Sequence, residues 1–161
     1  AFLDSKHLAS IAKLNIKPTL AELKELQELA RLHGINDIFQ DNGAKVLQQL
    51  IYLQFDALPG REGNDAVSVS GIQWEMKSIN RNTVSGFSTN HHLNFKIIEK
   101  YQQVPWSFAI YDGIDLESIY VVTPNQMIYW YRKWSSQLTE ENRDHLNNPH
   151  IPMSWVTKNG F

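Results

Sequence analysis

Two acidic residues and a lysine have types and a spacing that could carry out metal-assisted hydrolysis. Glu75 and Lys77 stand two residues apart in a segment, 72–77, whose composition is typical of a strand. Side chains on a strand alternate between its two faces, so Glu75 and Lys77 share one face. Trp74 and Met76 take the other face, as expected of a half-buried strand that borders a reactive cleft.

Asp65 can join this face in only one hairpin register. The segments on either side of Gly71 are typical of two strands joined by a turn. A two-residue turn would place Asp65 on the face away from Glu75, whereas a three-residue loop over 69–71 would set the two carboxylates directly opposite each other. Such loops combine a type I turn with a residue in the left-handed conformation, which suits Gly71. We therefore predict the three-residue register.

The resulting pair of carboxylates calls for a cation. Opposite residues on paired strands have Cβ atoms about 5 Å apart, and like charges that close raise the pKa of one of them. Oxygen ligands from Asp65 and Glu75 favour Mg²⁺, with Mn²⁺ as a possible substitute, over zinc. Such an ion polarises a phosphoryl oxygen and lowers the pKa of a bound water. Lys77 could orient or deprotonate that water or stabilise charge on the phosphate, so the set suits phosphodiester hydrolysis. The alternative is a solvated strand face, because Glu-x-Lys on a strand is common.

The composition bounds the class of protein. The 161 residues, 42% of them hydrophobic, suffice for one domain over 1–161 with a sizeable core. The absence of cysteine excludes disulfides and cysteine-ligated zinc. Neither a membrane span nor a signal peptide is visible, so we expect a cytoplasmic protein with no membrane partner. The net charge of −2 argues against a bulk electrostatic DNA binder, unless the basic residues gather on one wall of a cleft.

The surrounding sequence predicts an α+β domain with a mixed or antiparallel central sheet flanked by helices. A capping box that starts at Thr19 predicts a helix over about 19–33, with Gly34 just past its end. A second capping box, at Thr123, predicts another helix. The other expected elements are helices over 43–54 and 94–102, strands over 66–69, 72–77, 105–111 and 118–122, and a loop over 58–64.

With the catalytic pattern in place, the sequence resembles the PvuII family of type II restriction endonucleases, within the PD-(D/E)XK nuclease superfamily. The resemblance extends over roughly 32–160. It is carried by the segments 33–43, 58–67, 75–80, 86–89, 91–92, 100–101, 103–106 and 147–149.

The resemblance implies a restriction-endonuclease-like fold and a homodimer in the bacterial cytoplasm, with no nucleotide cofactor. Such a dimer would cut both strands of double-stranded DNA at the centre of the palindrome CAGCTG, leaving blunt ends with Mg²⁺. By position, Asp65, Glu75 and Lys77 match catalytic residues, Glu62 matches a carboxylate near the metal, and Tyr101 matches a tyrosine beside the scissile phosphate. The helix over 19–33 is the candidate dimer contact, and the alternative is that it merely covers the sheet.

Five residues match positions that contact or read DNA in the family. Asp41 corresponds to a contact from the minor-groove side, and the other four would serve in recognition: His91, His92, Asn147 and Asn148. Ser88, which flanks the histidines, would add a hydrogen-bonding group to this recognition set. Each has an ordinary alternative, such as solvated surface histidines or an asparagine turn before Pro149. One departure stands out, because Asn90 replaces the first of three consecutive histidines in the family.

Three rival functions remain open. A repair nuclease with the same catalytic residues would cut without a fixed palindrome. A DNA-binding protein of the same fold would not cut at all, and an ordinary interaction domain would only carry a charged strand face.

Overall fold

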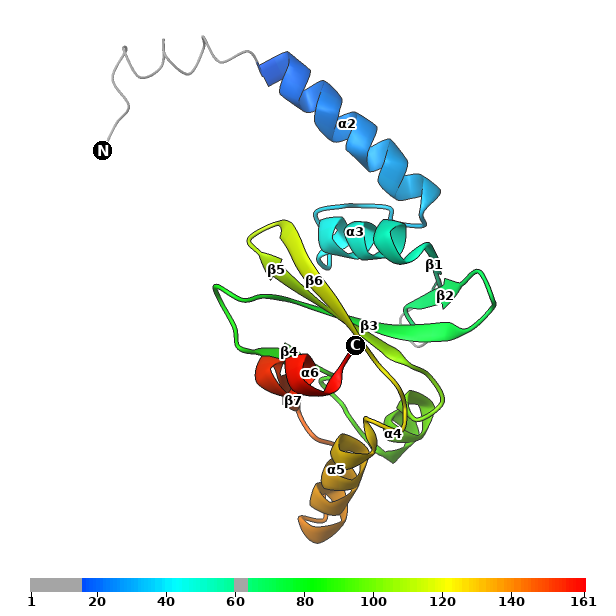
Figure 1. Cartoon of the computed structure of the whole chain (residues 1–161), viewed down its shortest axis with the longest axis vertical. Helices are drawn as coiled ribbons and strands as arrows, with labels where there is room; N and C mark the ends of the chain where they lie inside the picture. Colours follow the sequence, from blue (N-terminus) through cyan, green and yellow to red (C-terminus); the bar gives the residue numbers. More distant parts are fainter. Residues whose placement is uncertain (1–15, 60–63) are drawn as a thin grey trace, which may run out of the picture.

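The computed structural model describes residues 16–59 and 64–161, with the side chains of 16–20 left out. Their central feature is a five-stranded sheet in the order β1–β2–β3–β5–β6 (Figure 1). The strands are β1 (Phe55–Ala57), β2 (Ala66–Ser68), β3 (Gln73–Asn80), β5 (Trp106–Asp112) and β6 (Asp115–Val122). Strand β3 runs parallel to β5, and the other neighbours are antiparallel. The predicted α+β class with a mixed sheet is confirmed.

Alternation along the central strands divides the core into two layers. On β5, Trp106, Phe108 and Ile110 lie in the large core cluster, which also includes side chains of the helices α4 (Phe95–Tyr101), α5 (Ile128–Glu140) and α6 (Met153–Asn159). The other face of β5 meets α3 (Gly43–Leu53), where the Tyr111 hydroxyl donates to Lys45 O at 2.6 Å. Because Glu75 and Lys77 alternate in step with the buried Ile79, they face the side of the sheet on which α4 lies.

A smaller sheet carries part of the candidate recognition surface. Strand β4 (Gly86–Ser88) pairs antiparallel with β7 (His150–Pro152), with Ser88 opposite His150. The two strands come from distant parts of the chain, so this pairing brings the segment after β4 beside the segment before β7. Neither strand was expected from the sequence.

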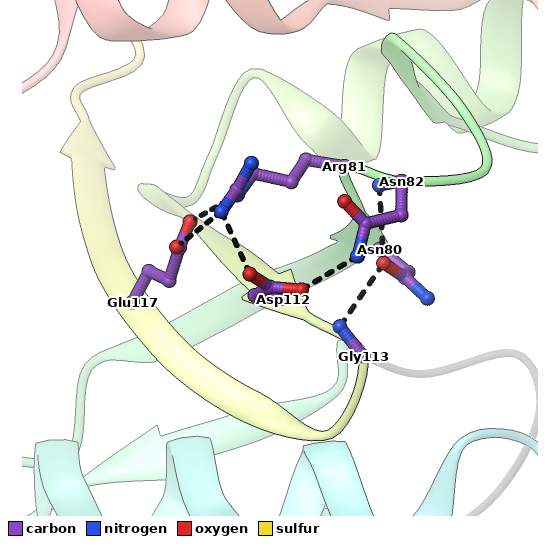
Figure 2. A network of polar contacts seen from close by, with 6 residues as sticks. All are labelled: Asn80, Arg81, Asn82, Asp112, Gly113 and Glu117. Atoms are coloured by element: carbon purple, nitrogen blue, oxygen red, sulfur yellow. Dashed lines mark hydrogen bonds and ion pairs between the residues drawn. The ribbon is translucent and has the colours of Figure 1, made fainter.

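The far end of β3 is joined to the β5–β6 hairpin by exposed polar groups (Figure 2). Arg81 makes two hydrogen bonds to Glu117, at 2.6 and 2.8 Å, and one to Asp112 at 2.8 Å. Asn82 donates to the other oxygen of Asp112 at 2.5 Å, and Asn80 accepts from Gly113 N at 3.2 Å. These bonds fix the chain where it leaves β3 toward β4.

Two predicted helix starts were wrong. Helix α2 (Ile16–Leu32) begins before Thr19 and runs through Pro18, which is tolerated because N–H groups in the first turn have no helical partner. The capping-box bonds of Thr123 do form, since its backbone N–H donates to Gln126 Oε1 at 2.8 Å, but they close a turn and α5 begins at Ile128. The helix predicted over 43–54 is α3, and Gly34, predicted to lie just past the end of α2, has a left-handed φ of 79°.

Candidate active site

The β2–β3 hairpin places Asp65 beside Glu75. The observed pairs are Ala66 with Trp74 and Val67 with Gln73, and Ser68 N donates to Ile72 O at 2.8 Å, as in the three-residue register. Asp65 directly precedes this ladder and lines the same cavity as Glu75. Gly71 adopts the left-handed conformation, with φ of 82°, as the three-residue loop requires. The predicted register is confirmed.

The carboxylate of Asp65 is hydrogen-bonded to strand β3. Its Oδ2 accepts a hydrogen bond from the backbone N–H of Met76 at 2.7 Å, and its N–H donates to Trp74 O at 3.0 Å. The side chain therefore reaches across to β3 at the level of Glu75, although the residue itself is solvent-exposed.

Glu75 is a buried carboxylate with only 4% of its surface exposed. Its Oε1 lies 2.8 Å from Lys77 Nζ. Burial raises the pKa of Glu75, the Lys77 ammonium opposes that rise, and the charge of Asp65 adds to it. The pKa stays raised, so the effect of burial outweighs the opposing charge of Lys77.

Lys77 is fixed from three sides. Besides Glu75, its Nζ donates to the backbone O of Thr89 at 3.0 Å and lies 5.8 Å from the ring centroid of Trp106. A lysine held this closely presents its charge at a defined point.

Tyr101 completes this wall from the last residue of α4. It is 3% exposed and packs edge-on against Trp106, with ring centroids 4.6 Å apart. Burial is the main cause of the raised pKa of its hydroxyl, and the charges of Glu75 and Asp65 add to the rise. The Tyr131 hydroxyl donates to Tyr101 O at 2.9 Å, which anchors the end of the helix.

These groups share a cavity of about 880 Å³. Asp65, Glu75, Lys77 and Tyr101 line it, and its wall from α4 contributes side chains of both signs, including Lys96, Lys100 and Glu99. The two lysines are four residues apart on one helix and therefore project on one side of it. They place local positive charge beside the carboxylates in a chain whose net charge is −2. The spacing of Lys96 and Lys100 within the predicted helix 94–102 could have indicated this wall.

A neighbouring hollow of about 560 Å³ gathers much of the candidate recognition set. Asp41, Ser88, His91 and Asn148 line it. Asp65 and Lys77 also border it, so the two hollows meet at the catalytic residues.

The remaining candidates lie elsewhere. His92 packs its ring against His145, with centroids 4.5 Å apart, and Asn147 is exposed beyond the lining of this hollow. Asp41, which lines the hollow, has a φ of 47° and stands one residue before Asn42, the N-cap of α3. Glu62 falls outside the described residues.

The donor set suits one hard cation. Among residues 16–59 and 64–161, no group of three or more His, Asp or Glu side chains is arranged to hold a metal. Mg²⁺ does not require one, since it keeps several waters and is commonly bound by one or two carboxylates together with substrate phosphate. The buried Glu75 beside Asp65 supplies such a pair, and a cation there would offset their repulsion.

The fold and the site together are those of an endonuclease of the restriction-enzyme class. A family model described as Restriction endonuclease PvuII matches residues 11–161, and the chain belongs to that family. It is therefore a type II site-specific deoxyribonuclease whose substrate is double-stranded DNA. This membership overturns the readings as an interaction domain or a non-cleaving DNA binder. None of the helices in the described part of the chain is long and apolar enough to span a membrane.

Proposed function

We propose that the enzyme cuts both strands of double-stranded DNA at the centre of CAGCTG, leaving blunt ends, by Mg²⁺-dependent hydrolysis in the bacterial cytoplasm. The family supports the class of reaction, and the resemblance of the recognition segments supports this particular palindrome. The observation that carries the catalytic part is the convergence of Asp65, buried Glu75 and Lys77 on one cavity wall.

Each catalytic side chain has a separate role in this proposal. Asp65 and Glu75 hold the cation, with Glu62 as a further carboxylate near it. When bound, Mg²⁺ (or Mn²⁺) supplies a polarised phosphoryl oxygen and a more acidic water. Lys77, fixed by Glu75 and Thr89, orients or deprotonates the attacking water or stabilises charge on the phosphate. Tyr101 lies beside the scissile phosphate.

Recognition is assigned to the segments that line the second hollow. His91 and His92 would donate hydrogen bonds to guanine edges in the major groove, where base pairs are distinguishable. An amide such as that of Asn147 or Asn148 can pair with adenine through both of its polar atoms. Ser88 adds a hydroxyl, and Asp41 would act from the minor-groove side. Four of these six residues border the hollow that also contains Asp65 and Lys77.

A blunt break calls for two active sites related by a two-fold axis, which matches the symmetry of a palindrome. We therefore propose a homodimer in which α2 is the contact. Leucines spaced three apart along α2 remain 37–40% exposed at Leu23, Leu26 and Leu29. Figure 1 shows the helix projecting away from the sheet, which disfavours the alternative that it merely covers the sheet.

Cleavage of a plasmid that carries one CAGCTG site tests the proposal. We expect one linear product with blunt ends in Mg²⁺ and no cleavage with Ca²⁺. The Lys77→Ala variant should cleave on the order of 10²–10³-fold more slowly, whereas Lys158→Ala, an exposed lysine at the end of α6, should behave like wild type. Fragments of random length would overturn the palindrome and favour a repair nuclease. Equal rates for Lys77→Ala and wild type would remove Lys77 from the mechanism.

A further inference from the structure

The connection between α2 and α3 forms a large part of the hollow that adjoins the active site. Most of residues 34–43, the Asp41 wall, line that hollow, and Asp41 itself is among them. The rest of the lining includes the candidate recognition residues Ser88, His91 and Asn148. A displacement of the Asp41 wall would therefore change the surface that the hollow offers to DNA.

One side chain of α2, that of Gln27, is hydrogen-bonded to three backbone groups of the Asp41 wall. Its Nε2 donates to Ile35 O at 3.3 Å and to Asn36 O at 3.0 Å. Its Oε1 accepts from Ile38 N at 3.0 Å. Both ends of the half-buried carboxamide are thus used, and because a carboxamide is rigid, the three bonds fix the wall at one place along the helix.

The segment that Gln27 holds leads directly to Asp41. The side chain of Ile38 is 3% exposed and packs in the small cluster that joins α2 to α3, and Ile38 O accepts from Ala44 N at 2.9 Å. Asp41 and Asn42 follow in the left-handed conformation, with φ of 47° and 61°. Residues other than glycine keep this conformation where the surrounding structure holds them in it. The place of Asp41 in the hollow therefore depends on how the wall is attached to the two helices.

We propose that Gln27 is a positioning residue for DNA binding, which fixes the Asp41 wall relative to α2. This inference rests on the proposed DNA contact of Asp41 and on the proposed dimer contact through α2. In such a dimer the helix that meets the partner also carries the wall, so the packing of the two α2 helices sets the spacing of the two walls on the palindrome. Without the bonds of Gln27 each wall shifts on its helix, and the two Asp41 side chains no longer meet the DNA together.

Two substitutions of Gln27 remove the three hydrogen bonds in different ways. Gln27→Met keeps the length of the side chain and a high helix propensity, and Gln27→Ala excludes a steric clash as the cause of any effect. Gln48→Met is the matched control. Gln48 is also a half-buried helical glutamine that ties its helix to a distant loop, since its Nε2 donates to Ile114 O at 3.0 Å in the β5–β6 turn.

The test measures the affinity for two DNA duplexes of equal length, one with the preferred site and one unrelated to it. The preferred site is first found by sequencing the ends that the wild-type enzyme produces, so an error in the CAGCTG assignment shows in that step alone. Binding is measured with Ca²⁺ in place of Mg²⁺. Thermal denaturation checks the fold, and sedimentation velocity checks the oligomeric state. Asp41→Ala is measured alone and together with Gln27→Met.

For both Gln27 variants we expect the affinity for the preferred site to fall by about tenfold, equivalent to about 1.4 kcal/mol. Affinity for the unrelated duplex, which depends mainly on phosphate contacts, should change by less than about threefold. Gln48→Met should lower Tm to a similar extent and leave both affinities unchanged. Asp41→Ala should weaken binding of the preferred site in wild type and have little further effect in Gln27→Met, because both changes remove the same contact.

Four results would overturn the positioning role. They are equal weakening on both duplexes, an equal loss of affinity in Gln48→Met, additive effects of Gln27→Met and Asp41→Ala, and a monomeric Gln27→Met protein, which would assign Gln27 to the dimer contact. An Asp41→Ala protein with wild-type affinity is a different failure, because it contradicts the proposed DNA contact of Asp41 and removes the basis of the inference with it.

Discussion

At the scale of single residues, the candidate active site contains one buried carboxylate and one exposed carboxylate. Glu75 is 4% exposed, whereas Asp65 is open to solvent. Burial raises the pKa of Glu75, and Asp65 adds to the rise despite the opposing charge of Lys77. A cation bound to both carboxylates favours the ionised form of Glu75, so protons and the cation compete for the same group.

This competition predicts a pH-dependent stabilisation by Ca²⁺. A cation that binds only the folded protein stabilises it by about 2.7 kcal/mol at one hundred times its Kd. A raised pKa means that Glu75 takes up its proton at a pH above the ordinary value of 4.5. The gain in Tm should be largest at a pH above that raised pKa and should disappear as the pH falls through it. Thermal denaturation with and without Ca²⁺ across a pH series measures it.

Without a bound cation, the stability of the fold should change with pH in the opposite direction, which provides an internal check. A carboxyl whose pKa is higher in the folded than in the unfolded state destabilises the fold once it is ionised, so its cost appears as the pH rises. Asp65→Asn should lose the Ca²⁺ gain, and Glu140→Gln, an exposed residue at the end of α5, should keep it. An undiminished gain in Asp65→Asn would show that the cation binds elsewhere.

At the scale of elements, the β2–β3 hairpin loop decides whether the carboxylates meet. The register of this hairpin could be predicted from the sequence. Side chains alternate between the two faces of a strand, so Asp65 could lie on only one of two faces, and Gly71 favours the loop that contains a left-handed residue. The surroundings of Glu75 could not be foreseen in this way. Tyr101 and Thr89 line the same cavity as Glu75, and only tertiary packing brings them there.

Gly71→Ala tests the importance of this loop. A side chain there would meet nothing within 4 Å, so the cost is the φ of 82° alone, about 1 kcal/mol. Gly113→Ala is a matched control, since it has a φ of 61° and open space in the β5–β6 turn. We expect similar losses in the free energy of unfolding from urea denaturation. Only Gly71→Ala should weaken the Ca²⁺ gain, and an equal weakening in both variants would contradict a special role for this hairpin.

The shortest elements escaped prediction for a physical reason. Strands β1, β4 and β7 have three residues each, too few to show a period of two. Pairing of β4 with β7 joins segments more than sixty residues apart, and only the folded chain brings them together. No local sequence pattern could therefore predict that Ser88 lies opposite His150.

The exposed network around Arg81 should stabilise the exit from β3 in a salt-dependent way. Arg81 joins two carboxylates on the β5–β6 hairpin, so its bonds connect segments about thirty residues apart (Figure 2). Arg143 has similar exposure, and its ion-pair partner within the described residues is Glu141, two positions earlier in the chain. We expect Arg81→Ala to lower Tm more than Arg143→Ala does, with a difference that shrinks at 1 M salt because exposed charges are screened. Equal Tm losses at low salt would mean that the network contributes nothing beyond a local pair.

At the scale of the whole molecule, α2 is the least covered element. Among its described side chains only Ala30 is buried, in a small cluster with Ile38 and Leu47 near the start of the globular part. The rest of the helix extends away from the sheet (Figure 1). Its exposed leucines lie on neighbouring turns, and such a stripe is costly to leave in water unless a partner covers it.

A charge placed in this stripe should separate the two halves of the proposed dimer without harming the active site. Leu26→Glu puts a carboxylate at a position 39% exposed in the single chain, where a partner helix would bury it. Ile114→Glu is the control, because Ile114 is 76% exposed in the distant β5–β6 turn. Sedimentation velocity should show wild type and Ile114→Glu as dimers and Leu26→Glu as a monomer. On a supercoiled plasmid, Leu26→Glu should lose the concerted double-strand break, since each active site serves one strand and both must be seated together on the palindrome. A Leu26→Glu protein that stays dimeric and cuts both strands at the wild-type rate would move the dimer contact to another surface of the molecule.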